Sequence, residues 1–207
     1  GDYVTFPLTE GSGSYTVKVF ENVSGTSYAQ AVSQTIQVNI ASDTTPFLYP
    51  NQFCNFNADS NVVTVSDTIT SGMTDPLKKV EAIYNYAVDN ITYDNQKAAT
   101  VQSGYLPNVD ATLAQKKGIC FDYAAVMTSM LRAQGIPTKL VIGYAGNVYH
   151  AWVSVYIQGQ GWVDNIIYFD GTDWKLMDPT FVSSGKKSAE VLNYVSNPAN
   201  YRQKFCY

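Results

Sequence analysis

Charged side chains, cysteine and histidine are all scarce in this chain. Only 14% of its 207 residues are charged, and 17 acidic against 13 basic residues give a formal net charge of −4. Such a chain has no basic face to neutralise phosphates, which excludes nucleic acid as a partner. No apolar run approaches the roughly 20 residues that span a bilayer, so we expect no membrane-spanning segment in this chain.

The single histidine, His150, argues against a metal site. Catalytic zinc takes about three nitrogen, sulfur or carboxylate ligands from the protein, and no second histidine is present. The sequence also lacks the Gly-rich loop that cradles phosphates in nucleotide-binding proteins. We therefore expect no metal, no cofactor and no bound nucleotide.

Three cysteines leave at least one thiol free. One arrangement pairs Cys54 with Cys206 in a disulfide and leaves Cys120 free to react, and the other leaves Cys54 and Cys206 as unrelated reduced residues. With so few charges, the surface must be made polar by Ser, Thr, Asn, Gln and Tyr. The chain has 16 tyrosines. This balance is typical of secreted bacterial proteins and predicts an extracellular or cell-surface location, which permits a disulfide.

The period of the hydrophobic pattern changes along the chain. Residues 15–20 and 33–40 alternate apolar and polar side chains, which predicts a β-hairpin. We assign 1–45 to a small β-rich N-terminal module, either packed on the main body or the remnant of a larger sandwich. Residues 46–207 are expected to form the main domain, with one more strand over 61–65.

Helices precede strands in the main domain. Asp75-Pro76 is a favourable helix start, and helical spacing of apolar residues predicts a helix over 75–91 and a second from Cys120 to Gln134. The strands expected after the second helix are 139–144, 150–157, 161–169 and 174–177. A short helix is expected near the end of the chain, over 189–194. Helices followed by an antiparallel sheet predict an α+β domain.

Cys120 lies at a predicted helix start, directly after the turn at Gly118-Ile119. The positive end of the helix dipole and the nearby Lys116 and Lys117 stabilise a thiolate there. The first backbone N–H groups of the helix also point at any oxyanion that forms beside the sulfur. A cysteine taken alone is more often a small buried hydrophobic residue, but this position favours a nucleophile.

His150 and Asp178 supply the other two groups that thiol chemistry needs. His150 begins a strand in which it shares a face with Trp152, and Asp178 ends the neighbouring predicted strand before Pro179. An imidazole can take the proton of the thiol, and a carboxylate can accept its second N–H and stabilise the imidazolium. His150 could instead be a hydrogen-bonded structural residue, and Asp178 a turn-forming residue. With Cys120, they predict a Cys-His-Asp triad.

Six blocks in residues 75–182 resemble the transglutaminase-like superfamily in order and spacing. The blocks are 118–124 around Cys120, 131–137 ending in Gly-Ile-Pro, 141–144, 150–153 beginning at His150, 161–163, and 177–180 containing Asp178. The resemblance implies a papain-like core of helices packed on an antiparallel sheet. It also implies that Cys120 attacks a carboxamide or peptide carbonyl to form a thioester, with His150 as general base and acid and Asp178 as orienter.

The chain departs from the animal crosslinking enzymes of this family. They carry a Gly-Gln-Cys-Trp block and calcium-binding loops, whereas this chain has Gly118-Ile119-Cys120-Phe121 and no acidic cluster suited to calcium. Calcium regulation is therefore not expected. The six blocks contain no match to the family's side-chain oxyanion donor, for which Tyr105 is a candidate. Trp152 is a candidate for lining the cleft, with a core position as its alternative.

The expected partner is a protein or peptide substrate, including one associated with the cell wall. If water resolves the thioester, the enzyme is an amidase or peptidase, and if an amine does, it is a crosslinking enzyme. The alternative is a catalytically silent binding or structural module of the cell surface. The sequence makes no prediction about oligomeric state.

Overall fold

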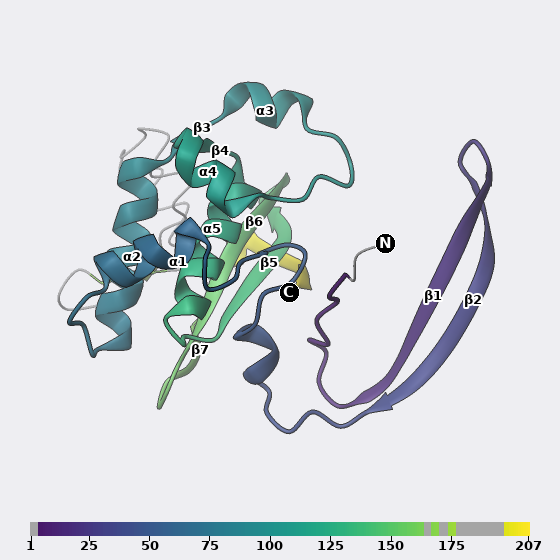
Figure 1. Ribbon diagram of the computed structural model, residues 1–207, viewed down its shortest axis with the longest axis horizontal. Helices are drawn as coiled ribbons and strands as arrows, with labels where there is room; N and C mark the ends of the chain where they lie inside the picture. Colours follow the sequence, from purple (N-terminus) through teal and green to yellow (C-terminus); the bar gives the residue numbers. More distant parts are fainter. Residues whose placement is uncertain (1–3, 164–166, 170–173, 177–196) are drawn as a thin grey trace.

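The computed structural model describes residues 4–163, 167–169, 174–176 and 197–207, and helix α5 (Cys120–Ala133) lies at its centre (Figure 1). The helix is buried along almost its whole length. One side of α5 packs on strands β5 (Thr138–Ala145) and β6 (Val148–Ile157), and other sides meet the helices α1 (Asn61–Ile69), α2 (Pro76–Asn90) and α4 (Val109–Gln115). The α+β class and the helix-on-sheet core predicted from the sequence are confirmed.

The main sheet has four antiparallel strands in the order β10-β5-β6-β7, where β7 is Gly161–Val163 and β10 is Tyr201–Cys206. Strands β8 (Ile167–Phe169) and β9 (Trp174–Leu176) pair with each other in a separate two-stranded sheet. The prediction of one strand over 161–169 was therefore wrong, because its two ends belong to different sheets. The strand at the C-terminal edge, β10, was not predicted.

Hydrophobic residues cover both faces of this sheet. The face toward α5 carries Leu140 and Val153 in the main core, together with Met127 and Leu131 of the helix. On the other face a second cluster is formed by Phe47, Val141, Trp152 and Cys206. Alternate residues of β5 and β6 therefore serve different cores, as the pleat of a strand requires.

Residues 61–69 form helix α1, so the strand predicted over 61–65 was wrong. Three valines in five residues have high strand propensity, but tertiary contacts override it here. The Asp110 carboxylate accepts hydrogen bonds from the backbone N–H groups of Asn61 and Val62, which would otherwise lack partners at a helix start. One turn later the buried Ser66 hydroxyl donates to the Met130 carbonyl of α5.

The helix predicted over 75–91 is α2, and its Asp75 side chain caps the N-terminus by accepting from the Leu77 amide. Two short elements that the sequence pattern did not reveal follow it. Strand β3 (Thr92–Tyr93) pairs in parallel with β4 (Lys117–Gly118), directly before Cys120. Helix α3 (Asn95–Thr100) is capped by Asp94, which accepts from the Lys97 amide.

The predicted N-terminal hairpin is present as β1 (Gly13–Ser24) and β2 (Ser27–Val38). Its strands are exposed along nearly their full length, and the hairpin extends away from the rest of the molecule (Figure 1). After it, residues 45–47 return to the main sheet, where Phe47 is buried. The module boundary at residue 45 stays a prediction.

The three cysteines are free thiols, so the arrangement with a Cys54–Cys206 disulfide is not the one observed. Cys54 belongs to the main core and Cys206 to the second cluster. The Cys54 sulfur accepts a hydrogen bond from the Arg132 guanidinium at 3.1 Å instead of forming a disulfide. Burial raises the pKa of both Cys54 and Cys206.

In the part of the chain that the structure describes, no helix has the length and apolar character needed to span a membrane. The short helix predicted over 189–194 and the last residue of the strand predicted over 174–177 lie outside the described residues.

Candidate active site

Cys120 lines a pocket of about 710 Å³ at the N-terminus of α5. One group of lining residues comes from α3 and the loop after it, including residues 101–105. The other comes from the main sheet, namely Ile142 of β5 and residues 148–151 of β6. Tyr93, Ile119 and Phe121 complete the lining. The pocket therefore gathers five separate parts of the chain around the thiol.

Asp122 fixes the first turn of the helix that carries Cys120. Its side chain is fully buried, and one carboxylate oxygen accepts a hydrogen bond from the Ile119 amide at 2.8 Å. Gly118 makes room for this contact, because a Cβ at that position would lie 2.7 Å from the Asp122 Cβ. The Gly-Ile-Cys-Phe-Asp run is thus a compact helix start in which the glycine admits the capping carboxylate.

Lys97 and Tyr105 meet the same carboxylate. The Lys97 ammonium donates to Asp122 at 2.6 Å and to the Tyr105 hydroxyl at 2.5 Å, and the Tyr105 hydroxyl donates to Asp122 at 2.5 Å. Burial alone would lower the pKa of Lys97, but its bonds to Asp122 and Tyr105 outweigh burial and raise the pKa. Burial and the hydrogen bond to Asp122 raise the pKa of Tyr105. These contacts tie α3 and the pocket loop to the start of α5.

His150 reaches the pocket from β6. It pairs with Gly143 of β5, is 5% exposed, and its ring stacks on Trp152 with centroids 6.2 Å apart. Trp152 in turn packs against Tyr201 of β10. Gly143 has no space for a side chain, since a Cβ there would lie 2.1 Å from the backbone oxygen of Arg202 in β10 and 2.8 Å from the Trp152 ring. The imidazole is therefore supported from behind by a packed aromatic residue.

The predicted site residues have different outcomes. Cys120, His150 and Tyr105 line one pocket, while Trp152 lies in the second hydrophobic cluster and contacts His150. The Tyr105 hydroxyl donates its hydrogen to Asp122, so in this conformation it is not directed at a substrate oxygen. Asp178 lies outside the described residues. The catalytic roles of all these residues stay predictions.

Sequence reasoning missed two residues at the pocket. Lys97 bonds to the buried carboxylate of Asp122, and Tyr149 lines the pocket beside His150. Nothing in the local pattern around Lys97 distinguishes it from a solvated surface lysine, because its partner is 25 residues away. Tyr149 has no such signal either, because successive strand residues point to opposite faces of a sheet and its place next to His150 does not predict a shared pocket.

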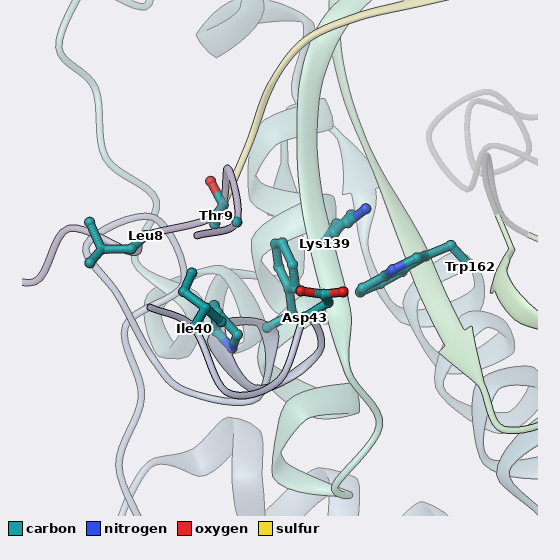
Figure 2. A pocket seen from close by; sticks show the side chains of 9 residues that line it. Leu8, Thr9, Ile40, Asp43, Lys139 and Trp162 are labelled. Atoms are coloured by element: carbon teal, nitrogen blue, oxygen red, sulfur yellow. The ribbon is translucent and has the colours of Figure 1, made fainter. Parts of the chain in front are cut away.

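A second pocket of about 300 Å³, which shares no lining residue with the Cys120 pocket, lies between residues 8–11 and the main sheet (Figure 2). Its lining includes Leu8 and Thr9 near the start of the chain, Asp43, and Lys139 and Trp162 of the main domain. The Lys139 ammonium lies 4.0 Å from the centre of the Trp162 ring, a cation–π contact. Among the residues lining this pocket in the described chain there is no cysteine or histidine.

Residues 63–165 match the family model described as the transglutaminase-like superfamily. This part of the chain belongs to the transglutaminase-like superfamily. The matched segment includes α2, α5 and the β5–β6 hairpin, and thus both Cys120 and His150. The family resemblance inferred from the six sequence blocks is confirmed.

Individual proteins are also similar to this chain. The chain is 29% identical over 148 residues to YebA of Bacillus subtilis, an uncharacterized protein, covering 62% of this chain but only 19% of YebA. A solved structure from Cytophaga hutchinsonii, provisionally described as a cysteine protease, is similar with a TM-score of 0.55 and 16% identity. That match covers all of this chain and 74% of the other. The periplasmic domain of TgpA from Pseudomonas aeruginosa gives a TM-score of 0.49 at 21% identity, over 78% of this chain and 56% of that domain.

Proposed function

We propose that this chain carries a thiol acyl-transfer centre in which Cys120 is the nucleophile, His150 the general base and acid, and Asp178 the group that orients His150. The observation that carries the proposal is the meeting of Cys120 and His150 in one pocket at the start of α5. A helix N-terminus favours a thiolate and offers backbone N–H groups to an oxyanion. Membership of the transglutaminase-like superfamily supports the same chemistry.

The proposed reaction has two steps. The Cys120 sulfur attacks the carbonyl carbon of a carboxamide or peptide bond, and its proton passes to His150. As the carbon–nitrogen bond breaks, the His150 imidazolium donates that proton to the leaving amine or ammonia, which leaves a thioester on Cys120. His150 then takes a proton from the incoming water or amine, and the carbon–sulfur bond breaks to restore the thiol.

The acceptor decides the name of the activity. Water gives an amidase or peptidase, and an amine such as a lysine side chain gives a crosslinking enzyme. We propose a protein or peptide donor in an extracellular or cell-surface setting, in keeping with the low charge of the chain. Separating ammonia release from incorporation of a fluorescent amine, with a protein donor such as casein, distinguishes the two acceptors.

The first test compares the three thiols in the native protein. Iodoacetamide should alkylate Cys120, which is partly exposed, much faster than the buried Cys54 and Cys206, whose raised pKa values keep them protonated. Intact-mass spectrometry with peptide mapping reports the site. The denatured chain should react at all three positions.

Two variants complete the test. Cys120→Ala should remove the fast-labelling site and all turnover of donor, while His150→Ala should slow labelling because the thiol loses its base. If Cys120 reacts only after denaturation, or if turnover survives Cys120→Ala, the proposal is wrong. The chain would then fit the alternative of a catalytically silent binding or structural module.

A further inference from the structure

We infer that the Cys120 pocket selects an uncharged acyl donor, a peptide segment with an apolar or aromatic side chain next to the reacting carbonyl, and rejects donors with a charged side chain there. The inference rests on the proposed function, because it assigns the substrate class of the same thiol. It is carried by the charge, exposure and placement of the residues that form the pocket.

The lining offers no partner to a charged substrate. Among the residues that the structure describes, those lining the pocket include no aspartate, glutamate, lysine or arginine. The nearby charges, Lys97 and Asp122, are already bonded to each other at 2.6 Å, and Asp122 also accepts from Tyr105 and the Ile119 amide. A charge brought into this pocket would lose water without gaining an ionic partner, which is unfavourable.

Three of the residues that line the pocket are exposed hydrophobic side chains. Val101 after α3 is 38% exposed, while Val148 and Tyr149 of β6 are 63% and 57% exposed, and all three line the pocket. They come from segments more than 40 residues apart in the chain, so no local sequence feature explains their gathering. Apolar groups that converge on a pocket of this size are typical of a ligand site, where the ligand removes them from water.

The uncharged, partly apolar lining therefore favours an uncharged occupant. A neutral apolar or aromatic side chain covers Val101, Val148 and Tyr149 while its carbonyl carbon reaches the Cys120 sulfur. A carboxylate or ammonium group at the same position gains none of this burial. Discrimination by an unpaired buried charge reaches about tenfold or more in rate.

Four tripeptidyl chloromethyl ketones test the inference. They are identical except that the residue before the reactive group is Leu, Phe, Glu or Lys. The Cys120 sulfur displaces chloride from the methylene carbon to form a thioether, and the thiol proton passes to His150 or solvent. Each labelling rate, measured by intact mass, is divided by the iodoacetamide rate of the same protein, since iodoacetamide is too small to report on side-chain selection.

We expect the Leu and Phe probes to label Cys120 at least about tenfold faster than the Glu and Lys probes after this division. In Val148→Lys the labelling rate of the Glu probe should rise several-fold relative to that of the Lys probe. In Val148→Glu the Lys probe should instead label faster than the Glu probe. Val23→Lys is the matched control: Val23 is 67% exposed on β1, outside the pocket, so all ratios should stay at their original values.

Each outcome has one meaning. If iodoacetamide fails to label native Cys120, the proposed function fails and this inference falls with it. If iodoacetamide labels Cys120 but the four probes react within about twofold of one another, the inference alone is overturned and the reactive thiol stands. A preference for neutral probes that Val148→Lys and Val148→Glu leave unchanged also overturns it, because the selecting surface would then lie elsewhere.

Discussion

Asp122→Asn should destabilise the protein and slow alkylation of Cys120. The buried carboxylate accepts from the Ile119 amide, Lys97 and Tyr105 at 2.5 to 2.8 Å. Asparagine keeps the volume but has one acceptor oxygen and no charge, so the Lys97 ammonium loses its ionic partner. Charge-assisted hydrogen bonds contribute about 1.5–3 kcal/mol each, which we reduce because Lys97 is partly exposed to screening solvent.

The expected loss in free energy of unfolding is about 2–3 kcal/mol, which lowers Tm by about 4–12 °C in a protein of this size. Urea titration and thermal melting measure it. The control is Glu81→Gln, which removes a carboxylate from the exposed ion pair with Lys78 and should cost less than about 0.5 kcal/mol. If Asp122→Asn unfolds like Glu81→Gln, or labels Cys120 at the original rate, the assigned role of Asp122 is refuted.

Three further predictions follow from the packing. Gly143→Ala places a Cβ 2.1 Å from the backbone oxygen of Arg202 in β10 and 2.8 Å from the Trp152 ring, so it should disturb the β5–β10 pairing and the support of the imidazole and slow alkylation of Cys120 in a labelling assay. Arg132→Lys should cost about 2–4 kcal/mol in urea unfolding, because one ammonium cannot replace a buried guanidinium that donates five hydrogen bonds; an unchanged midpoint would contradict this. Because the pKa of Tyr105 is raised, the folded protein keeps the phenol proton after the unfolded chain has lost it, so stability should fall above about pH 10. Tyr105→Phe should flatten that fall, as measured by unfolding at several alkaline pH values.

Elements with a clear period were predictable from sequence, and those decided by distant contacts were not. The helical spacing of residues 75–91 and the Gly-Ile-Pro exit after α5 indicated the two main helices correctly. Residues 61–65 have strand propensity, yet Asp110 caps them as a helix and α5 packs against them. A carboxylate 48 residues away leaves no local signal.

The site shows the same division. Local reasoning identified Cys120 at a helix start and His150 on a strand, and both line the pocket. The pairing of Lys97 with Asp122 brings helix α3 to the start of α5 across 25 residues, which no local pattern specifies. For Trp152 the sequence left a cleft position and a core position open, and the structure has its side chain in the second hydrophobic cluster.

The position of β10 at the edge of the main sheet affects how this protein folds during synthesis. β5 ends at residue 145 and its partner β10 begins at residue 201, so the ribosome must add more than 50 residues before that edge is covered. Until then β5 presents unpaired backbone groups, which are a template for aggregation. Trp152 also lacks Tyr201 and Cys206 during this interval. Strand β10, whose Tyr201 packs against the Trp152 ring that stacks on His150, is therefore among the last parts of the fold to be completed. Such long-range pairing slows folding.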